Sequence, residues 1–140
     1  MSQMRSDCVF FCPIRVRYAE VDIQGVVYNV NYLLYTDVAF DEFLRFRGYS
    51  YRELASEHGS EVCHKKTMIE YTSSAFQDDV LEVGVRVIRI GNSSFTLGFE
   101  IYRQNEDDPL VTAEIVYVGY NTEKRSSQPI TALMRSLLEG

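Results

Sequence analysis

Hydrophobic and polar residues alternate along four stretches of the chain, residues 61–72, 80–90, 94–104 and 110–121. The alternation is clearest in the third stretch, where the apolar positions are Phe95, Leu97, Phe99 and Ile101. A period of two residues places one side of a β-strand in a core and the other side toward solvent. We therefore predict four strands here, with Gly91 and Asn92 forming a tight hairpin turn between the second and the third.

The first half of the chain begins with a fifth alternating stretch and then changes to a helical period. Residues 9–18 predict a strand with a phase slip near Pro13, and residues 30–46 predict a long helix. One face of that helix is apolar and mostly aromatic: Tyr32, Tyr35, Ala39, Phe43 and Phe46. Residues 51–57 suggest a short helical turn, and Pro129 is suited to open a terminal helix.

The order of these elements predicts the architecture. A helix that is apolar around most of its circumference is normally covered by other structure. We therefore expect an α+β protein in which a five-stranded antiparallel sheet surrounds one long central helix. A length of 140 residues suits a single domain, which we expect to span residues 1–140.

Composition and charge narrow the classes of partner. The chain is 46% hydrophobic and has a net charge of −6, from 14 basic and 20 acidic residues. This balance argues against nucleic acid or an anionic membrane as a partner, since both are bound through basic surfaces. No apolar run reaches the roughly 18 residues that a spanning helix needs, and residues 1–7 lack the apolar core of a signal peptide. We expect a cytoplasmic protein without membrane insertion.

Metal and cofactor motifs are not found in the sequence. Phosphate-binding loops, dinucleotide fingerprints and zinc-protease motifs are missing. Cys63, His64 and His58 are the nearest approach to a metal site, but adjacent strand residues point to opposite faces. The three cysteines, an odd number, exclude a disulfide framework. We expect no metal and no cofactor.

Candidate chemistry is concentrated between residues 16 and 32. Asp22 lies just before a turn at Gly25, and the turn leads directly into the long helix. Unpaired backbone N–H groups at the start of a helix can polarise a carbonyl group. A carboxylate beside them can attack that carbonyl or activate a water molecule, and Gly25 would allow a ligand to approach the backbone. From the residues alone, a solvated acidic loop with Asp22 in a turn remains the alternative.

The same segment resembles the signature of the hotdog-fold acyl-CoA thioesterases of the 4-hydroxybenzoyl-CoA thioesterase type, including the bacterial short-chain branch associated with the Tol–Pal cluster. The residues that match its pattern are Tyr18, Glu20, Asp22, Gly25, Val27, Asn31 and Tyr32. The later segments 70–71, 78–83 and 91–95 also resemble the family, so the resemblance covers nearly the whole chain. It implies a single hotdog domain and thioester hydrolysis, with coenzyme A entering only as part of substrate and product.

The resemblance also implies roles for individual residues. Asp22 takes the position of the catalytic carboxylate, acting as nucleophile or general base, and the backbone N–H of Asn29 that of the carbonyl-polarising group. Tyr28 and Gly25 would shape the pocket. Many members of the Tol–Pal branch have histidine at the position of Asn29, and asparagine cannot transfer a proton by titration. Glu20 is either solvated or a like charge that raises the pKa of one of the two carboxyl groups.

Binding of the nucleotide is implied at the hairpin turn, through Asn92, Ser93 and Ser94 with Arg89 nearby. Five further basic residues could meet phosphate or simply be solvated: Lys65, Lys66, Arg103, Lys124 and Arg125. The uncharged turn leaves room for an acyl-carrier-protein substrate. Aromatic residues of the helix, Tyr32, Tyr35, Phe40, Phe43 and Phe46, either line an acyl pocket or pack the core.

Three functions are compatible with these residues. The first is an acyl-CoA thioesterase, the second an acyl-carrier-protein thioesterase, and the third a hotdog protein that binds acyl groups or partners without turnover. A hotdog dehydratase is disfavoured, because neither His58 nor His64 lies in the motif segment. The resemblance further implies a homodimer or homotetramer with active sites between subunits.

Overall fold

The computed structural model describes residues 5–140, so residues 1–4 of the expected domain lie outside the described residues. The main strands are β1 (Phe10–Arg15), β2 (Val62–Tyr71), β3 (Val80–Ile90), β4 (Ser94–Arg103) and β5 (Val111–Asn121). They form the expected antiparallel sheet, and the order of its strands is β1-β3-β4-β5-β2. A short strand β6 (Ser126–Ser127), which the alternation does not predict, pairs with β5.

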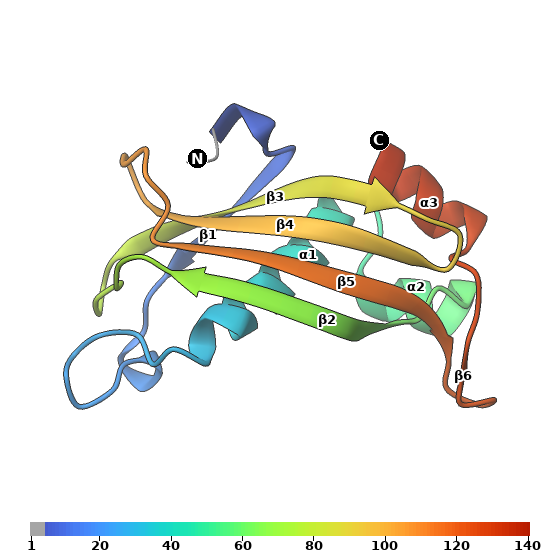
Figure 1. Ribbon diagram of the computed structural model, residues 1–140, viewed down its shortest axis with the longest axis horizontal. Helices are drawn as coiled ribbons and strands as arrows, with labels where there is room; N and C mark the ends of the chain where they lie inside the picture. The colour runs from blue at the N-terminus through green and yellow to red at the C-terminus, as the bar shows by residue number, and fades with distance from the viewer. Residues whose placement is uncertain (1–4) are drawn as a thin grey trace.

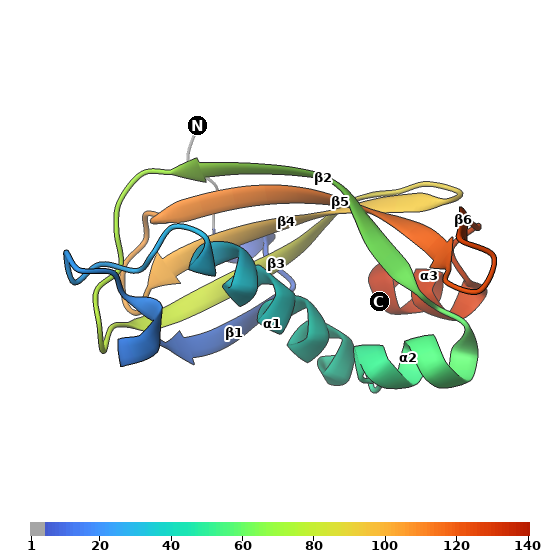
Figure 2. The same ribbon diagram turned by 90° about the horizontal axis from the view of Figure 1, so that it is seen from below.

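Three α-helices accompany the sheet: α1 (Asn31–Phe46), α2 (Tyr51–His58) and α3 (Ala132–Glu139). Two short 3-10 turns, η1 (Arg5–Asp7) and η2 (Tyr18–Glu20), flank β1. The sheet curls over α1, which crosses its concave face (Figures 1 and 2). This is the hotdog arrangement that the resemblance implies, and the expected fold class is confirmed.

The core lies between α1 and the inner face of the sheet. The inward positions of β4, namely Phe95, Leu97, Phe99 and Ile101, are fully buried, which confirms the alternation. From α1, the aromatic residues Tyr32, Tyr35, Phe40 and Phe43 are buried against them, whereas Phe46 is 60% exposed. Four of the five helix aromatics therefore pack the core.

Two predicted boundaries are wrong for local reasons. The first strand ends at Arg15 rather than at residue 18, because the Glu20 carboxylate accepts the Arg17 backbone N–H (2.9 Å) and closes the η2 turn. The last helix begins at Ala132 rather than at Pro129, since the Thr131 hydroxyl accepts the Met134 N–H (3.1 Å) and caps it. At each of these two boundaries, a side-chain oxygen accepts a hydrogen bond from a backbone N–H, and this bond sets where the strand ends or the helix begins.

Candidate active site

Asp22 lies in a tight turn between η2 and α1. Its backbone N–H donates to the Val26 carbonyl (2.9 Å), and its own carbonyl accepts the Gly25 N–H (2.9 Å). The carboxylate is half-buried, and Oδ1 accepts the Gln24 backbone N–H (2.8 Å). Among residues 5–140 no group donates a hydrogen bond to the second carboxylate oxygen. Asp22 is thus held by its turn with one oxygen free to act.

Gly25 gives the turn its shape through a left-handed backbone conformation. Its φ is +81°, and an added Cβ would meet nothing within 4 Å. Gly25 is therefore needed for its torsion angle, and crowding plays no part.

Replacing Gly25 with alanine tests this assignment. The left-handed conformation costs a residue with a Cβ about 1 kcal/mol, so we expect the free energy of unfolding to fall by about that amount. Chemical denaturation measures the change, with the exposed neighbour in Gln24→Ala as the control. Equal stability of both variants would show that the turn relaxes without strain.

The start of α1 carries a second candidate functional group, the backbone N–H of Asn29. The Tyr28 N–H donates to the Glu20 carbonyl (2.9 Å) and the Asn31 N–H to the Tyr28 carbonyl (2.8 Å). Within the described part of the chain, the N–H of Asn29 and that of Val30 have no acceptor. These free donors lie at the positive end of the α1 dipole, where negative charge is stabilised. The geometry suits polarisation of a carbonyl oxygen.

Glu20 is buried and its own pKa is lowered, which corrects the expectation that it is solvated or has a raised pKa. Only 6% of the residue is exposed. Its carboxylate accepts hydrogen bonds from the Arg17 side chain (Nε, 2.6 Å) and from the Tyr35 hydroxyl (2.9 Å). Burial raises the pKa of Glu20, but these hydrogen bonds outweigh it and leave the pKa below its usual value. The pair with Arg17 closes the η2 turn, and the hydrogen bond from Tyr35 ties that turn to α1, directly before Asp22.

Exposed apolar side chains surround this loop. They are Tyr18, Ile23, Tyr28, Val30, Leu34 and Phe76. Val30 and Leu34, with Val38 one turn later, form a stripe along the outer side of α1. Ile23 at the tip of the turn is fully exposed. Exposed apolar side chains gathered along one helix side are typical of an interaction surface.

The expected nucleotide-binding turn lies at the opposite end of β3 from the Asp22 loop (Figure 1). The hairpin is confirmed, although its loop spans residues 91–93 rather than Gly91 and Asn92 alone. The C-terminal segment covers it: the Ile130 N–H donates to the Asn92 carbonyl (3.1 Å) and Arg135 to the Gly91 carbonyl (2.6 Å). Arg135, which the sequence did not suggest, therefore donates a hydrogen bond to this loop.

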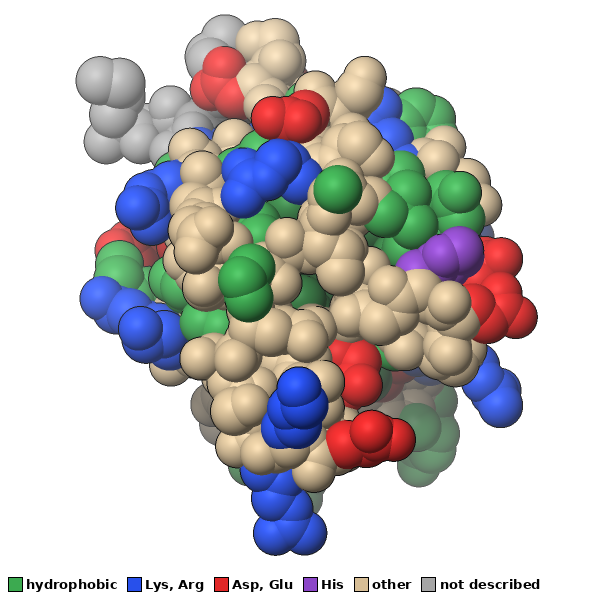
Figure 3. Space-filling model, turned by 90° about the vertical axis from the view of Figure 1, so that its right-hand side faces the viewer, with side chains coloured by type: hydrophobic (Ala, Val, Ile, Leu, Met, Phe, Trp, Pro, Cys, Tyr) green, Lys and Arg blue, Asp and Glu red, His purple; other side chains and the backbone are tan. Residues whose placement is uncertain are grey.

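The remaining turn residues and basic candidates are spread over the molecule. Asn92 and Arg89 are exposed, Ser93 and Ser94 half-buried. Lys65 and Lys66 lie on β2, and Lys124 and Arg125 between β5 and β6. Arg103 is held by ion pairs to Asp79 (3.0 Å) and Glu106 (3.1 Å). At the end of the molecule that carries α3, basic side chains stand in several separate places among acidic ones (Figure 3).

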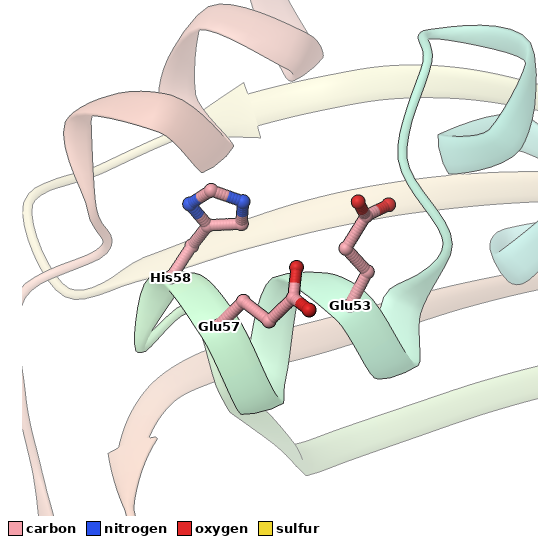
Figure 4. Close-up of side chains that lie close together, drawn as sticks. All are labelled: Glu53, Glu57 and His58. Carbon is pink, nitrogen blue, oxygen red and sulfur yellow. The ribbon is translucent and has the colours of Figure 1, made fainter.

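Within residues 5–140, three side chains of α2 form a group of metal-type ligands that the sequence did not suggest. Glu53, Glu57 and His58 on α2 bring their ligand atoms within 4.8 Å of one another (Figure 4). Glu57 and His58 are exposed and Glu53 is half-buried, and exposed acidic clusters commonly hold no ion. His58 also packs edge-on against Tyr49. The cluster therefore gives no support for metal chemistry.

Cys8 and Cys12 are poor nucleophiles because their surroundings raise the pKa of both thiols. Burial, followed by the charge of Glu100, raises the pKa of Cys8 to about 12. Burial, followed by the charge of Glu42, raises the pKa of Cys12 to about 11. Since the thiolate is the nucleophile, neither residue competes with Asp22 for that role.

A large hollow of about 580 Å³ lies over the outer face of the sheet, away from Asp22. Its charged lining includes Glu70, Arg86, Glu100 and Glu114. The buried Glu100 carboxylate accepts hydrogen bonds from Arg86 Nε (2.9 Å) and from the Tyr102 hydroxyl (2.8 Å). The Glu100 carboxylate is therefore already paired inside the protein.

Comparison with known proteins shows the family to which the chain belongs. Residues 16–137 match the family model described as the thioesterase-like superfamily, so the chain belongs to that superfamily. The acyl-CoA thioester hydrolase YbgC of Escherichia coli O6:H1 is 32% identical over 110 residues, covering 79% of this chain and 81% of that protein. The match includes the Asp22 loop, which begins shortly after residue 16.

Solved structures share the fold. A hypothetical protein from Aquifex aeolicus superposes with a TM-score of 0.85 at 26% identity, over 92% of this chain and 98% of that one. A 1,4-dihydroxy-2-naphthoyl-CoA thioesterase from Synechocystis gives a TM-score of 0.83 at 21% identity, over 92% and 94% of the two chains. Among residues 5–140, no helix combines the length and the apolar character needed to cross a membrane.

Proposed function

We propose that this thioesterase hydrolyses acyl-CoA to a free acid and coenzyme A, using Asp22 and the backbone N–H of Asn29. The N–H would polarise the thioester carbonyl. The Asp22 carboxylate would then attack the carbonyl carbon or remove a proton from a water molecule that does so. Breaking the carbon–sulfur bond releases the thiol, and water supplies the oxygen of the acid. The reaction needs no cofactor.

The observation that carries this proposal is the unpaired N–H of Asn29 at the start of α1, next to the turn that holds Asp22. A free donor at a helix start stabilises charge that develops on a carbonyl oxygen. The asparagine side chain is not required for this, so the departure from histidine at position 29 does not remove the chemistry. Gly25 and Tyr28 would shape the acyl end of the site.

We further place the chain with the 4-hydroxybenzoyl-CoA thioesterase type and, within it, the Tol–Pal-associated branch. The motif residues from Tyr18 to Tyr32 support this placement. Asn92, Ser93, Ser94 and Arg89 remain the proposed nucleotide contacts, now joined by Arg135. They lie at the other end of β3 from Asp22, so a single chain does not bring the two halves together.

We propose that a homodimer, or a tetramer built from dimers, unites these halves between subunits. The apolar stripe of Val30, Leu34 and Val38 beside the Asp22 loop is the surface a second copy would cover. Leu34→Glu places a charge in that surface, so we expect a shift toward monomer together with loss of thioester hydrolysis. Sedimentation velocity with a parallel activity assay measures both.

Ile88→Glu is the matched control, since Ile88 on β3 is similarly exposed, 39% against 44% for Leu34. We expect it to leave the assembly unchanged. Dissociation by Ile88→Glu and not by Leu34→Glu would place the interface on β3 instead.

The experiment that tests the function is free-thiol release from short, long and aromatic acyl-CoAs and from the corresponding acyl-carrier-protein thioesters. Release from acyl-CoA supports the proposal and begins to define the acyl group. Faster release from the carrier protein would move the assignment to the second candidate function. Acyl binding without release from any thioester would identify a binding protein and overturn the proposal.

A further inference from the structure

A second cavity opens between α1, α2, β2 and β5. Its volume is about 250 Å³, and its lining residues are Asp37, Phe40, Tyr51, Val62, His64 and Tyr117. Asp37 lies six residues beyond Asn31, about 9 Å along α1 at 1.5 Å per residue. The cavity is therefore separate from the Asp22 turn and uses none of its residues.

Aromatic rings form most of the cavity wall. Phe40 and Tyr117 are buried, with ring centroids 4.8 Å apart, and they close its inner side. The ring of Tyr51 lies 6.0 Å from that of Phe40. The Tyr51 hydroxyl holds this ring in place, because it donates to the Val62 carbonyl and accepts the Val62 N–H, both at 3.1 Å. The wall is thus formed before a ligand enters, and aromatic rings attract cations through their π-electrons.

The mouth of the cavity carries its acidic group. The side chains of Asp37 and His64 are 58% and 49% exposed, so they mark the open side. Asp37 Oδ1 lies 3.4 Å from His64 Nε2, and an imidazole is ordinarily uncharged at pH 8. Within residues 5–140, the lining contains no lysine or arginine. At that pH, no cation of the lining offsets the charge of Asp37.

The few free acceptors of the cavity favour one kind of cation. A primary ammonium group has three N–H donors and is strongly hydrated, so it needs several acceptors on leaving water. The Tyr51 hydroxyl is already bonded to Val62, which leaves acceptors at the mouth alone. A quaternary ammonium group has no donors to satisfy, and aromatic walls are the surroundings in which proteins hold it.

We propose that this cavity binds a small quaternary ammonium ion, with its methyl groups against Phe40 and Tyr51 and its charge toward Asp37. A cavity of about 150 Å³ is enough for benzene, so a trimethylammonium group with a short tail fits the space. An anion would be repelled by the Asp37 carboxylate. A neutral molecule of the same shape would contact the same rings but gain nothing from Asp37.

This inference does not rest on the proposed thioesterase mechanism. It uses none of the residues around Asp22, and its measurement is equilibrium binding rather than turnover. Failure of the binding prediction would leave the thiol-release experiment unaffected, and the reverse also holds.

The test compares choline with its uncharged carbon analogue, 3,3-dimethylbutan-1-ol, by NMR titration at pH 8. The assembled protein is used, because Asp37 precedes Val38 of the stripe that a second copy would cover. We expect choline to bind about tenfold more tightly than the alcohol, the combined gain typical of a cation–π contact and a partly exposed ion pair. Equal dissociation constants for the two probes, or no binding of either, would overturn the proposal.

Ethanolamine, which carries a primary ammonium group on the same two-carbon chain, separates the two kinds of cation. We expect it to bind more weakly than choline. Tighter binding of ethanolamine would show an ion pair at Asp37 without a role for the rings, and would contradict the proposal.

A matched pair of charge variants assigns the preference to the cavity. Asp37→Asn removes the charge at its mouth, so we expect the preference for choline over the alcohol to fall about threefold. Glu42→Gln removes the same charge from an exposed side chain of α1 outside the cavity and should retain the preference. An equal fall in both variants would mean that the net charge of the protein, and not this cavity, attracts choline.

Tyr51→Leu and Tyr51→Phe test the aromatic wall. Both variants lose the hydroxyl bonded to Val62, but only Tyr51→Leu loses the ring. We expect choline to bind about threefold more weakly to Tyr51→Leu than to Tyr51→Phe, with the alcohol binding both alike. Equal binding of choline to the two variants would remove the ring from the site and contradict the proposal.

Discussion

Asp22→Asn is expected to lower kcat/KM for thioester hydrolysis about a hundredfold or more while the protein remains folded. Asparagine is a far weaker nucleophile and base than a carboxylate, and such groups typically contribute about 10²- to 10⁴-fold to the rate. Asparagine Oδ1 can still accept the Gln24 N–H, a bond of 2.8 Å in the parent protein. The turn should therefore persist, and the assay is thiol release at saturating and subsaturating acyl-CoA.

Asp108→Asn provides the control for this change, because Asp108 is exposed in the loop between β4 and β5. Its kcat/KM should equal that of the parent. Circular dichroism and unfolding of Asp22→Asn confirm that a loss of rate is not a loss of fold. Parent-like turnover in Asp22→Asn would reduce Asp22 to a turn residue and leave the N–H of Asn29 without its proposed partner.

The regular elements were predictable because one face of each is buried. The alternation of β4 specified which side chains reach the core, and the observed burial of Phe95, Leu97, Phe99 and Ile101 agrees. The helical period gave α1 to within one residue at its start, Asn31 against residue 30. Period alone carries this information, since it follows from the geometry of a strand or a helix.

The candidate site was predictable only as a segment of the chain. Asp22, Gly25 and Asn29 lie close in sequence, and the local turn brings their backbones together. The contact between the hairpin loop and Arg135 was not predictable from the sequence, because it joins residues 44 positions apart. The cavity lined by Asp37, Tyr51, His64 and Tyr117 likewise joins α1, α2, β2 and β5, four elements whose side chains meet only after the chain has folded.

Glu20 shows the same limit in a single residue. In the sequence it is one of two nearby carboxylates, with nothing to mark it as buried. Its partner Tyr35 lies 15 positions away, and the pair forms because α1 packs back over the η2 turn. The contact that corrects the expected solvated Glu20 is thus tertiary.

Glu20→Gln is accordingly expected to destabilise the fold by about 2 kcal/mol at pH 7. Hydrogen bonds to a charged group are worth about 1.5–3 kcal/mol, and glutamine offers one acceptor oxygen where three donor groups converge. Its amide would also turn donors toward Arg17 and the Tyr35 hydroxyl. Because η2 supports the turn of Asp22, we expect thiol release to fall in the same variant.

The stability lost in Glu20→Gln should become smaller as the pH falls. Since the pKa of Glu20 is lowered on folding, its carboxylate stabilises the native state fully above the ordinary value, 4.5. That contribution declines as the pH falls through the lower folded-state pKa. Urea unfolding of both proteins from pH 7 to pH 3 should therefore show their stabilities converging in acid. Glu42→Gln, which affects an exposed pair with Arg45, should change stability by less than about 1 kcal/mol at any of these values. If the free energies of unfolding of Glu20→Gln and the parent differ by the same amount at every pH, the effect of Glu20 comes from its shape and not from its charge.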